Sequence, residues 1–174
     1  MASRLADRFT QTFRTEHREI RDTLLDLVDA FLTGDQARAR GLVAQTARLA
    51  GPHFRYEEES LYPLLVAIFG EEYIEKLLRD HDGAIDAARR LATLGAQGQL
   101  NDVETREAVQ LVRGILPHVS DCDGLSIMVE RLPDDQIESI FATRERALAA
   151  GLDLLRWATD VRTRPAHSPE RSGS

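Results

Sequence analysis

Four of the five histidines in this chain stand where side chains can do metal chemistry. His17, His53, His81 and His118 each lie on the apolar stripe of a different predicted helix, whereas His167 lies in a polar tail. When amphipathic helices pack around one core, residues on their apolar stripes meet inside it. Four inward imidazoles from four helices predict a metal site.

Further donor groups stand within about one helical turn of two of these histidines. Glu57 follows His53 by four residues, and this spacing turns a helix by only about 40°, so both side chains point the same way. They can therefore share one metal ion. The residues after His118 offer oxygen or sulfur donors, namely Asp121, Cys122 and Asp123.

The donor set indicates which metals could bind. Burying four unpaired imidazoles and a carboxylate would cost several kcal/mol, and a metal gives each of them a partner. The alternative is a purely structural bundle in which each histidine is hydrogen-bonded to a neighbour. Imidazole with carboxylate suits iron, manganese or zinc. Because one tetrahedral zinc would leave donors idle, two iron ions bridged by Glu57 and a second carboxylate fit better.

Composition limits the other possibilities. The chain has 174 residues, 43% hydrophobic and 29% charged, which fits one domain, expected over residues 1–160. Residues 161–174 are expected to be a disordered tail, since from Thr163 almost no residue is apolar.

A net charge of -7 without a dense Lys/Arg cluster disfavours nucleic acid as a partner. Residues 1–30 lack a signal-peptide pattern and there is a single cysteine, so a cytoplasmic location is expected. The longest uncharged run, Ser60 to Gly70, is too short to span a membrane.

Apolar periodicity predicts five helical segments that position these donors. They comprise a first helix from Leu5 to Phe31, a second over residues 42–68 with Gly51-Pro52 and Pro63 as kinks or breaks, a third from about Glu72 to Leu94, a fourth that opens with Asn101 and Glu104 as a capping box and runs to Leu132, and a fifth after Pro133 that reaches Leu155. The predicted fold is all-α, an antiparallel up-down four-helix bundle with an additional C-terminal helix.

Several of these motifs resemble a known family. The segments Glu16-His17-Arg18-Glu19-Ile20, His53-Phe54-Arg55-Tyr56-Glu57-Glu58-Glu59 with Leu61-Tyr62-Pro63, Asp80-His81 and the helix of His118 look like the hemerythrin-like (HHE cation-binding) domains in order and spacing. The resemblance covers roughly residues 5–132. It implies a four-helix bundle around a non-haem di-iron centre that binds small oxidants such as O2 or NO.

The third helix departs from the pattern of hemerythrins that carry O2. These proteins have a second histidine four residues after the first, and this chain has Ile85 at that position. One iron would therefore lose a nitrogen ligand and gain an open position. By resemblance, this loss is associated with NO response, iron-centre repair, iron sensing or peroxide chemistry rather than with O2 storage.

The fourth helix departs as well. Many family members have Glu four residues after the histidine, where this chain has Cys122, and hemerythrins proper use Asp at five, which matches Asp123. An ideal helix turns Cys122 inward and Asp123 about 140° away from His118. Gly124 could permit a distortion that swings Asp123 inward, and a carboxylate suits iron better than a thiolate. Asp123 is thus the predicted bridge, with Cys122 second.

The predicted ligand set is His17, His53, Glu57, His81, His118 and Asp123, with Cys122 as the alternative to Asp123. Two function hypotheses use this set. The first is a di-iron protein that binds O2, NO or peroxide in sensing, detoxification or iron-centre repair. The second is a di-iron oxygenase or peroxidase acting on an organic substrate or hydrogen peroxide. A large apolar cavity at the metals would favour the second, because a diatomic gas needs only a narrow channel.

Overall fold

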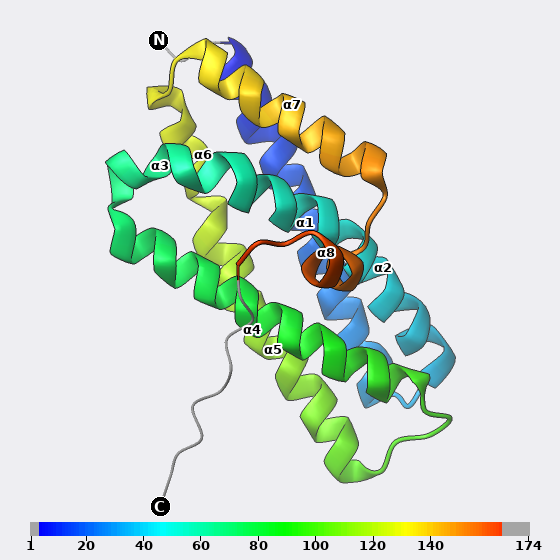
Figure 1. Ribbon diagram of the computed structural model, residues 1–174. Helices are drawn as coiled ribbons and strands as arrows, with labels where there is room; N and C mark the ends of the chain where they lie inside the picture. The colour runs from blue at the N-terminus through cyan, green and yellow to red at the C-terminus, as the bar shows by residue number, and fades with distance from the viewer. Residues whose placement is uncertain (1–3, 165–174) are drawn as a thin grey trace, which may run out of the picture.

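The computed structural model describes residues 4–164, and every regular element in that range is helical (Figure 1). In chain order these are α1 (Arg4–Leu32), α2 (Gln36–Tyr56), a π-helical turn η1 (Glu57–Leu61), α3 (Tyr62–Phe69), α4 (Glu71–Ala96), α5 (Asp102–Asp123), α6 (Leu125–Met128), a 3-10 turn η2 (Val129–Arg131), α7 (Asp134–Ala150) and α8 (Leu154–Asp160).

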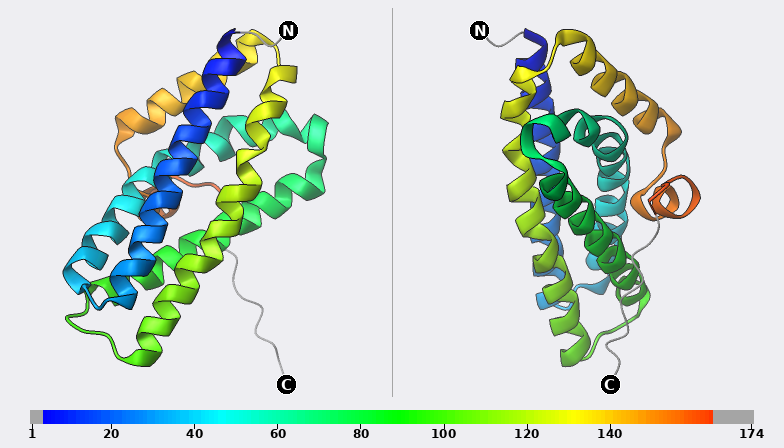
Figure 2. Two further views of the ribbon diagram at one scale, coloured as in Figure 1. Left: turned by 180° about the vertical axis from the view of Figure 1, so that it is seen from behind. Right: turned by 60° about the vertical axis from the view of Figure 1, so that its left-hand side comes forward.

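The first four long segments form the predicted bundle, and this confirms the fold class. Helix α1, the α2–η1–α3 unit, α4 and α5 pack lengthwise, and α1 and α5 lie together on the face opposite α8 (Figure 2). Helix α5 opens on the predicted capping box, in which the Asn101 side chain accepts from the Glu104 backbone N–H and the Glu104 carboxylate accepts from the Asn101 N–H.

Two apolar clusters enclose the middle of the bundle. One contains Phe9 and Phe13 of α1 with buried residues of α3 and α7, and the other contains Ile20 and Leu24 of α1 with buried residues of α4 and α5. His17 lies between them in the sequence of α1 and is itself buried. The four predicted histidines and Glu57 are all buried, and they lie in the centre of the bundle between two layers of hydrophobic packing.

The second predicted segment breaks at one of its two expected places. Helix α2 continues without interruption through Gly51 and Pro52. The chain becomes π-helical at Glu57, where the Tyr62 N–H donates to the Glu57 carbonyl five residues back. Pro63 explains this position, because proline has no N–H and its ring clashes with the carbonyl four residues earlier in a regular helix. The wider π turn relieves this clash, and π turns are common at functional sites.

The last two predicted helices are shorter than the sequence pattern suggests. Helix α5 ends at Asp123, and the chain continues to Leu132 through α6 and η2. The single helix expected after Pro133 is divided in two, because Gly151 adopts a left-handed conformation (φ 62°) and ends α7 at Ala150. Helix α7 packs on α1 and α2, whereas α8 lies against α2 and α4 (Figure 1).

The end of the described chain is anchored rather than free. Trp157 of α8 is buried in a third apolar cluster with Phe54 and Ile85. Arg162 and Arg164 then form ion pairs with the Asp82 carboxylate on α4. The disordered tail expected over residues 161–174 thus begins with residues that make ion pairs, and its remainder, residues 165–174, lies outside the described residues. Within residues 4–164, no helix is both long and apolar enough to cross a membrane.

A close backbone approach joins α8 to the bundle. A methyl group added at Gly51 would lie 2.5 Å from the Leu152 carbonyl oxygen and 2.7 Å from the Leu154 nitrogen. Both neighbours are backbone atoms, which cannot move aside as a flexible side chain would. Only glycine at position 51 therefore lets the α7–α8 connection rest directly on α2.

We expect Gly51→Ala to lower the free energy of unfolding by about 1–3 kcal/mol, because the added methyl forces the two backbones apart. Gly41→Ala is the matched control. Gly41 lies in the same helix, and a methyl group added there would have no neighbouring side chain or packed segment within 4 Å. The control should be neutral or stabilising by up to about 1 kcal/mol. Urea denaturation of both variants measures the difference, and equal stabilities would contradict the packing argument.

Candidate metal centre

The four predicted histidines converge in the middle of the bundle. Nε2 of His17 and Nε2 of His53 are 3.3 Å apart, and the rings of His81 and His118 lie with centroids 4.7 Å apart. Two nitrogens bound to one ion at about 2.1 Å each, at angles of 90–110°, are separated by roughly 3.0–3.4 Å. The His17 and His53 nitrogens therefore already have the separation of two ligands to one metal ion.

Glu57 lies at the centre of this group and is completely buried. Its Oε1 is 3.3 Å from Nε2 of His53 and 4.0 Å from Nε2 of His17, and its Oε2 is 3.1 Å from Nε2 of His81. One carboxylate oxygen thus faces the first pair of histidines and the other faces the second. This is the arrangement that a bridging carboxylate requires.

On the first two helices, the outer nitrogen of each histidine is held by an acceptor. Nδ1 of His17 is 3.0 Å from the Phe13 carbonyl oxygen, and Nδ1 of His53 is 2.8 Å from Oε2 of Glu16. A proton on Nδ1 donates to these oxygens, which leaves the Nε2 lone pair of each ring directed at the centre. Metal-binding histidines are oriented by this kind of outer hydrogen bond.

The second pair follows the same rule. Nδ1 of His81 is 2.8 Å from Oε1 of Glu58, and Nδ1 of His118 is 3.4 Å from Oδ2 of Asp80. Nε2 of His118 is buried and has no hydrogen-bond partner among the described residues. A buried polar atom without a partner is costly, so the His118 nitrogen fits a ligand atom that waits for a metal.

The sequence did not identify the three carboxylates that orient histidines. Glu16 and Asp80 stand next to His17 and His81, yet each holds the histidine of the following helix, and Glu58 next to Glu57 holds His81. A carboxylate directly beside a ligand residue was the available signal, but its partner depends on how the helices are packed.

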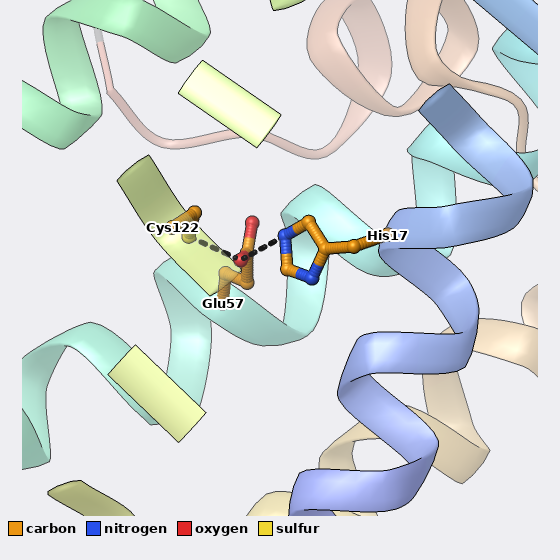
Figure 3. Close-up of side chains that lie close together, drawn as sticks. All are labelled: His17, Glu57 and Cys122. Atoms are coloured by element: carbon orange, nitrogen blue, oxygen red, sulfur yellow. Dashed lines mark hydrogen bonds and ion pairs between the residues drawn. The ribbon is translucent and has the colours of Figure 1, made fainter. Parts of the chain in front are cut away.

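The structure reverses the order of the two fourth-helix candidates in distance from Glu57. Cys122 is fully buried and its thiol donates to Oε1 of Glu57 at 3.0 Å, so Glu57 lies between His17 and Cys122 (Figure 3). The Asp123 side chain is 43% exposed, and its Oδ1 lies 4.0 Å from Nδ1 of His17, on the outer side of that ring, buried and without a hydrogen-bond partner among the described residues. Helix α5 ends at Asp123 and Gly124 keeps right-handed helical angles (φ -65°, ψ -22°), so the interruption at Gly124 leaves Asp123 beside His17 and does not bring it to Glu57.

Two aromatic side chains complete the walls of the site. The Tyr62 hydroxyl lies 3.1 Å from Nε2 of His81 and 3.4 Å from Sγ of Cys122, so it faces the donor atoms. The ring of Phe54 stacks on that of His81 with centroids 3.8 Å apart and excludes water from that side. Ile85, at the position of the absent second histidine, packs in the apolar cluster beneath α8.

Burial and mutual charge shift the pKa values of these groups in opposite directions. Burial lowers the pKa of His17 to about 3 and that of His118 to about 4. Burial also opposes protonation of His53, but the carboxylates of Glu57 and Glu16 outweigh it and raise its pKa to about 10. Despite burial, His53 and His81 hold the pKa of Glu57 well below its ordinary value. Without metal, a proton on His53 thus provides the positive charge that Glu57 requires.

Comparison with known proteins agrees with this geometry. The profile of the hemerythrin HHE cation binding domain matches residues 8–125, well over half of the chain and all five of the converging His and Glu residues. The chain belongs to the hemerythrin HHE cation-binding domain family. Comparisons with curated proteins and with solved structures gave no match.

The chain beyond the matched hemerythrin segment also contributes to the site. Nε of Arg144 on α7 donates to Oε1 of Glu16 at 2.6 Å, and Nη2 of Arg162 donates to Oε1 of Glu58 at 2.7 Å. These are the two carboxylates that orient His53 and His81. Arg162 is only 5% exposed, so its ion pair with Glu58 is poorly screened by solvent. The C-terminal extension therefore fixes two metal-facing imidazoles from outside the bundle.

Hollows lead to the histidines from several sides, and two of them differ clearly in polarity. An apolar cavity of about 280 Å³ reaches His17, His53 and His118 from within the bundle. A second hollow, lined by Arg14, Arg18 and Arg21 along with His17 and Asp123, opens on the outer surface of α1 and α5. The site is thus accessible through an apolar space and through a polar one.

We expect Arg162→Gln to weaken metal binding by about 10–100-fold, since loss of an outer support of a metal ligand usually has this effect. Competition with a chromophoric chelator measures the change. Arg156→Gln is the control, because Arg156 on neighbouring α8 is exposed and, among residues 4–164, its side chain pairs only with Asp160. Equal affinities of the two variants and the parent protein would show that Arg162 does not hold the site.

Proposed function

We propose that this protein holds two non-haem iron ions and uses them to bind or react with O2, NO or peroxide. The observation that carries the proposal is the common orientation of the four imidazoles. Each has its Nδ1 near an outer acceptor. Nε2 lies within 4.0 Å of the buried Glu57 carboxylate in His17, His53 and His81, and His118 has a ligand nitrogen within 4.8 Å of the Glu57 and His81 ligand atoms. A structural bundle would need only satisfied histidines, whereas Nε2 of His118 has no partner among residues 4–164.

The donor atoms divide into two groups that share Glu57. His17, Glu57 and Cys122 bring three ligand atoms within 4.8 Å of one another, and so do Glu57, His81 and His118. His53 joins the first group through its 3.3 Å approach to His17. Two metal ions bridged by Glu57 would use every one of these donors, while one tetrahedral ion would leave some idle.

The second group leaves room for an exogenous ligand. It has one donor fewer than the first, because Ile85 packs away from the site. Non-haem iron with an open coordination position binds small oxidants and supplies redox chemistry. The Tyr62 hydroxyl, 3.1 Å from Nε2 of His81, is placed to donate a hydrogen bond to such a ligand. Burial raises the pKa of Tyr62 well above its ordinary value, so this hydroxyl keeps its proton.

A second candidate function is the oxidation of an organic substrate at the same centre. The specific observation in its favour is the apolar cavity, whose wall includes His17, His53 and His118. Its volume of about 280 Å³ exceeds what a diatomic gas needs and approaches the lower end of the roughly 300–1,000 Å³ typical of small-molecule sites. The two functions share one metal centre and differ in what occupies this cavity.

We expect the protein purified from iron-supplied cells to contain about two iron ions per chain. The Glu57→Gln variant should contain one iron ion or fewer, because a neutral amide is a poor bridge between two cations. Elemental analysis, with the visible spectrum before and after adding NO or peroxide, measures both. Glu59→Gln is the control, since Glu59 lies in the same π turn but is exposed and pairs with Arg55. One zinc and no iron in the parent protein would refute the proposal.

The fourth-helix ligand is decided by a pair of variants. Since the Cys122 thiol and not the Asp123 carboxylate contacts Glu57, we propose Cys122 as the ligand and expect Cys122→Ser to remove an intense visible charge-transfer band of the ferric protein. Asp123→Asn should keep the band and both irons. Loss of iron in Asp123→Asn, with Cys122→Ser unaffected, would return the assignment to Asp123.

A further inference from the structure

The apolar cavity has a polar end and long hydrophobic walls. His17, His53 and His118 form one end, where Nε2 of His118 is buried without a partner among the described residues. Most of the remaining lining is aliphatic and comes from α1, α2, α4 and α5, with Leu154 and Leu155 of α8 covering one side. An apolar space of this kind favours an apolar occupant over water.

The lining residues show that the cavity is long and narrow. On α2 they run from Arg40 to Phe54, and on α4 from Ala84 to Ala96. At about 1.5 Å per residue these stretches span about 21 and 18 Å. A volume of about 280 Å³ spread over this length describes a long, narrow space, which suits a linear chain better than a bulky ring system.

Small side chains create this space. Ala47, Ala88 and Ala92 are among the alanines that line the facing sides of α2 and α4. An engineered cavity of about 150 Å³ holds benzene, so by proportion about 280 Å³ accommodates roughly eleven carbon atoms. The expected occupant is therefore a single medium-length hydrocarbon chain.

The end remote from the histidines carries a positive charge. Arg40 is exposed at this end, and its Nε and Nη2 donate to the carbonyls of Gly95 and Ala96 at the end of α4. These two bonds fix the guanidinium at the mouth, and Nη1 has no acceptor among residues 4–164. A fixed guanidinium with a remaining donor matches a carboxylate.

We propose that the cavity binds a medium-chain linear carboxylic acid, with its carboxylate at Arg40 and its terminal carbons beside His17, His53 and His118. This inference deepens the second candidate function, because the carbon atoms farthest from the carboxylate would lie next to the metals. Binding itself depends on the cavity walls and Arg40, and it needs no metal.

Calorimetric titration with decanoate tests the proposal on both metal-free and iron-loaded protein. We expect saturable 1:1 binding to both forms. Adamantane-1-carboxylate carries the same charge on a compact cage, and we expect it not to bind, since the cavity is too narrow. Binding of both acids alike, or of neither, would overturn the proposal.

Two sets of variants locate the site. Arg40→Gln should weaken decanoate binding about tenfold while Arg40→Lys largely retains it, because the charge is kept. Ala88→Phe should fill the cavity and abolish binding, whereas Ala37→Phe, at an exposed position of α2 outside the lining, should not. Unchanged binding in both Arg40→Gln and Ala88→Phe would place decanoate elsewhere and refute the assignment.

The two proposals fail separately. If metal does not load but metal-free protein binds decanoate with this pattern of variants, the iron function is wrong and the cavity assignment stands. If iron loads and responds to NO or peroxide but decanoate binds to neither form, the carboxylic acid is excluded and the iron function stands.

Discussion

The structure depends on one buried carboxylate. Glu57 is inaccessible to solvent, and a charge in that position is tolerated only when opposite charge and hydrogen-bond donors surround it. His53 and His81 lie within ion-pair distance of its two oxygens, and the Cys122 thiol donates a hydrogen bond to Oε1. Three helices, α2, α4 and α5, must meet at one level to provide these contacts, so the requirement of a single side chain constrains how the bundle is assembled.

The orienting hydrogen bonds link the helices in chain order. Glu16 of α1 holds the histidine of α2, Glu58 of the π turn holds that of α4, and Asp80 of α4 holds that of α5. Each of the first three segments thus supplies a candidate ligand of its own and the support for the candidate ligand of the next. The arginines of the C-terminal extension bind the first two of these carboxylates, which couples the extension to the same series.

Much of this arrangement could be predicted from residue spacing, because helix periodicity fixes which side chains share a face. The four inward histidines, the His53 and Glu57 pair and the all-helical bundle follow from that rule, and the family match confirms the resemblance. Periodicity says nothing about partners on other helices, so Glu16, Asp80 and the arginines of the extension could not be assigned. On α5 the ideal-helix argument alone turned Cys122 inward, and the structure buries Cys122 completely because α5 remains helical through Asp123.

The π turn at Glu57–Leu61 has a consequence for how this chain tolerates insertions and deletions. A π turn accommodates one residue more than an α turn, so the helix after it is rotated by about 100° relative to an uninterrupted helix. This phase shift lets His53 and Glu57 face the site while Tyr62 also turns its hydroxyl toward it from α3. Removing one residue here would keep the helix continuous, yet it would send α3 into the bundle with the wrong face. The length of this short segment is therefore as constrained as the identity of the proposed metal ligands.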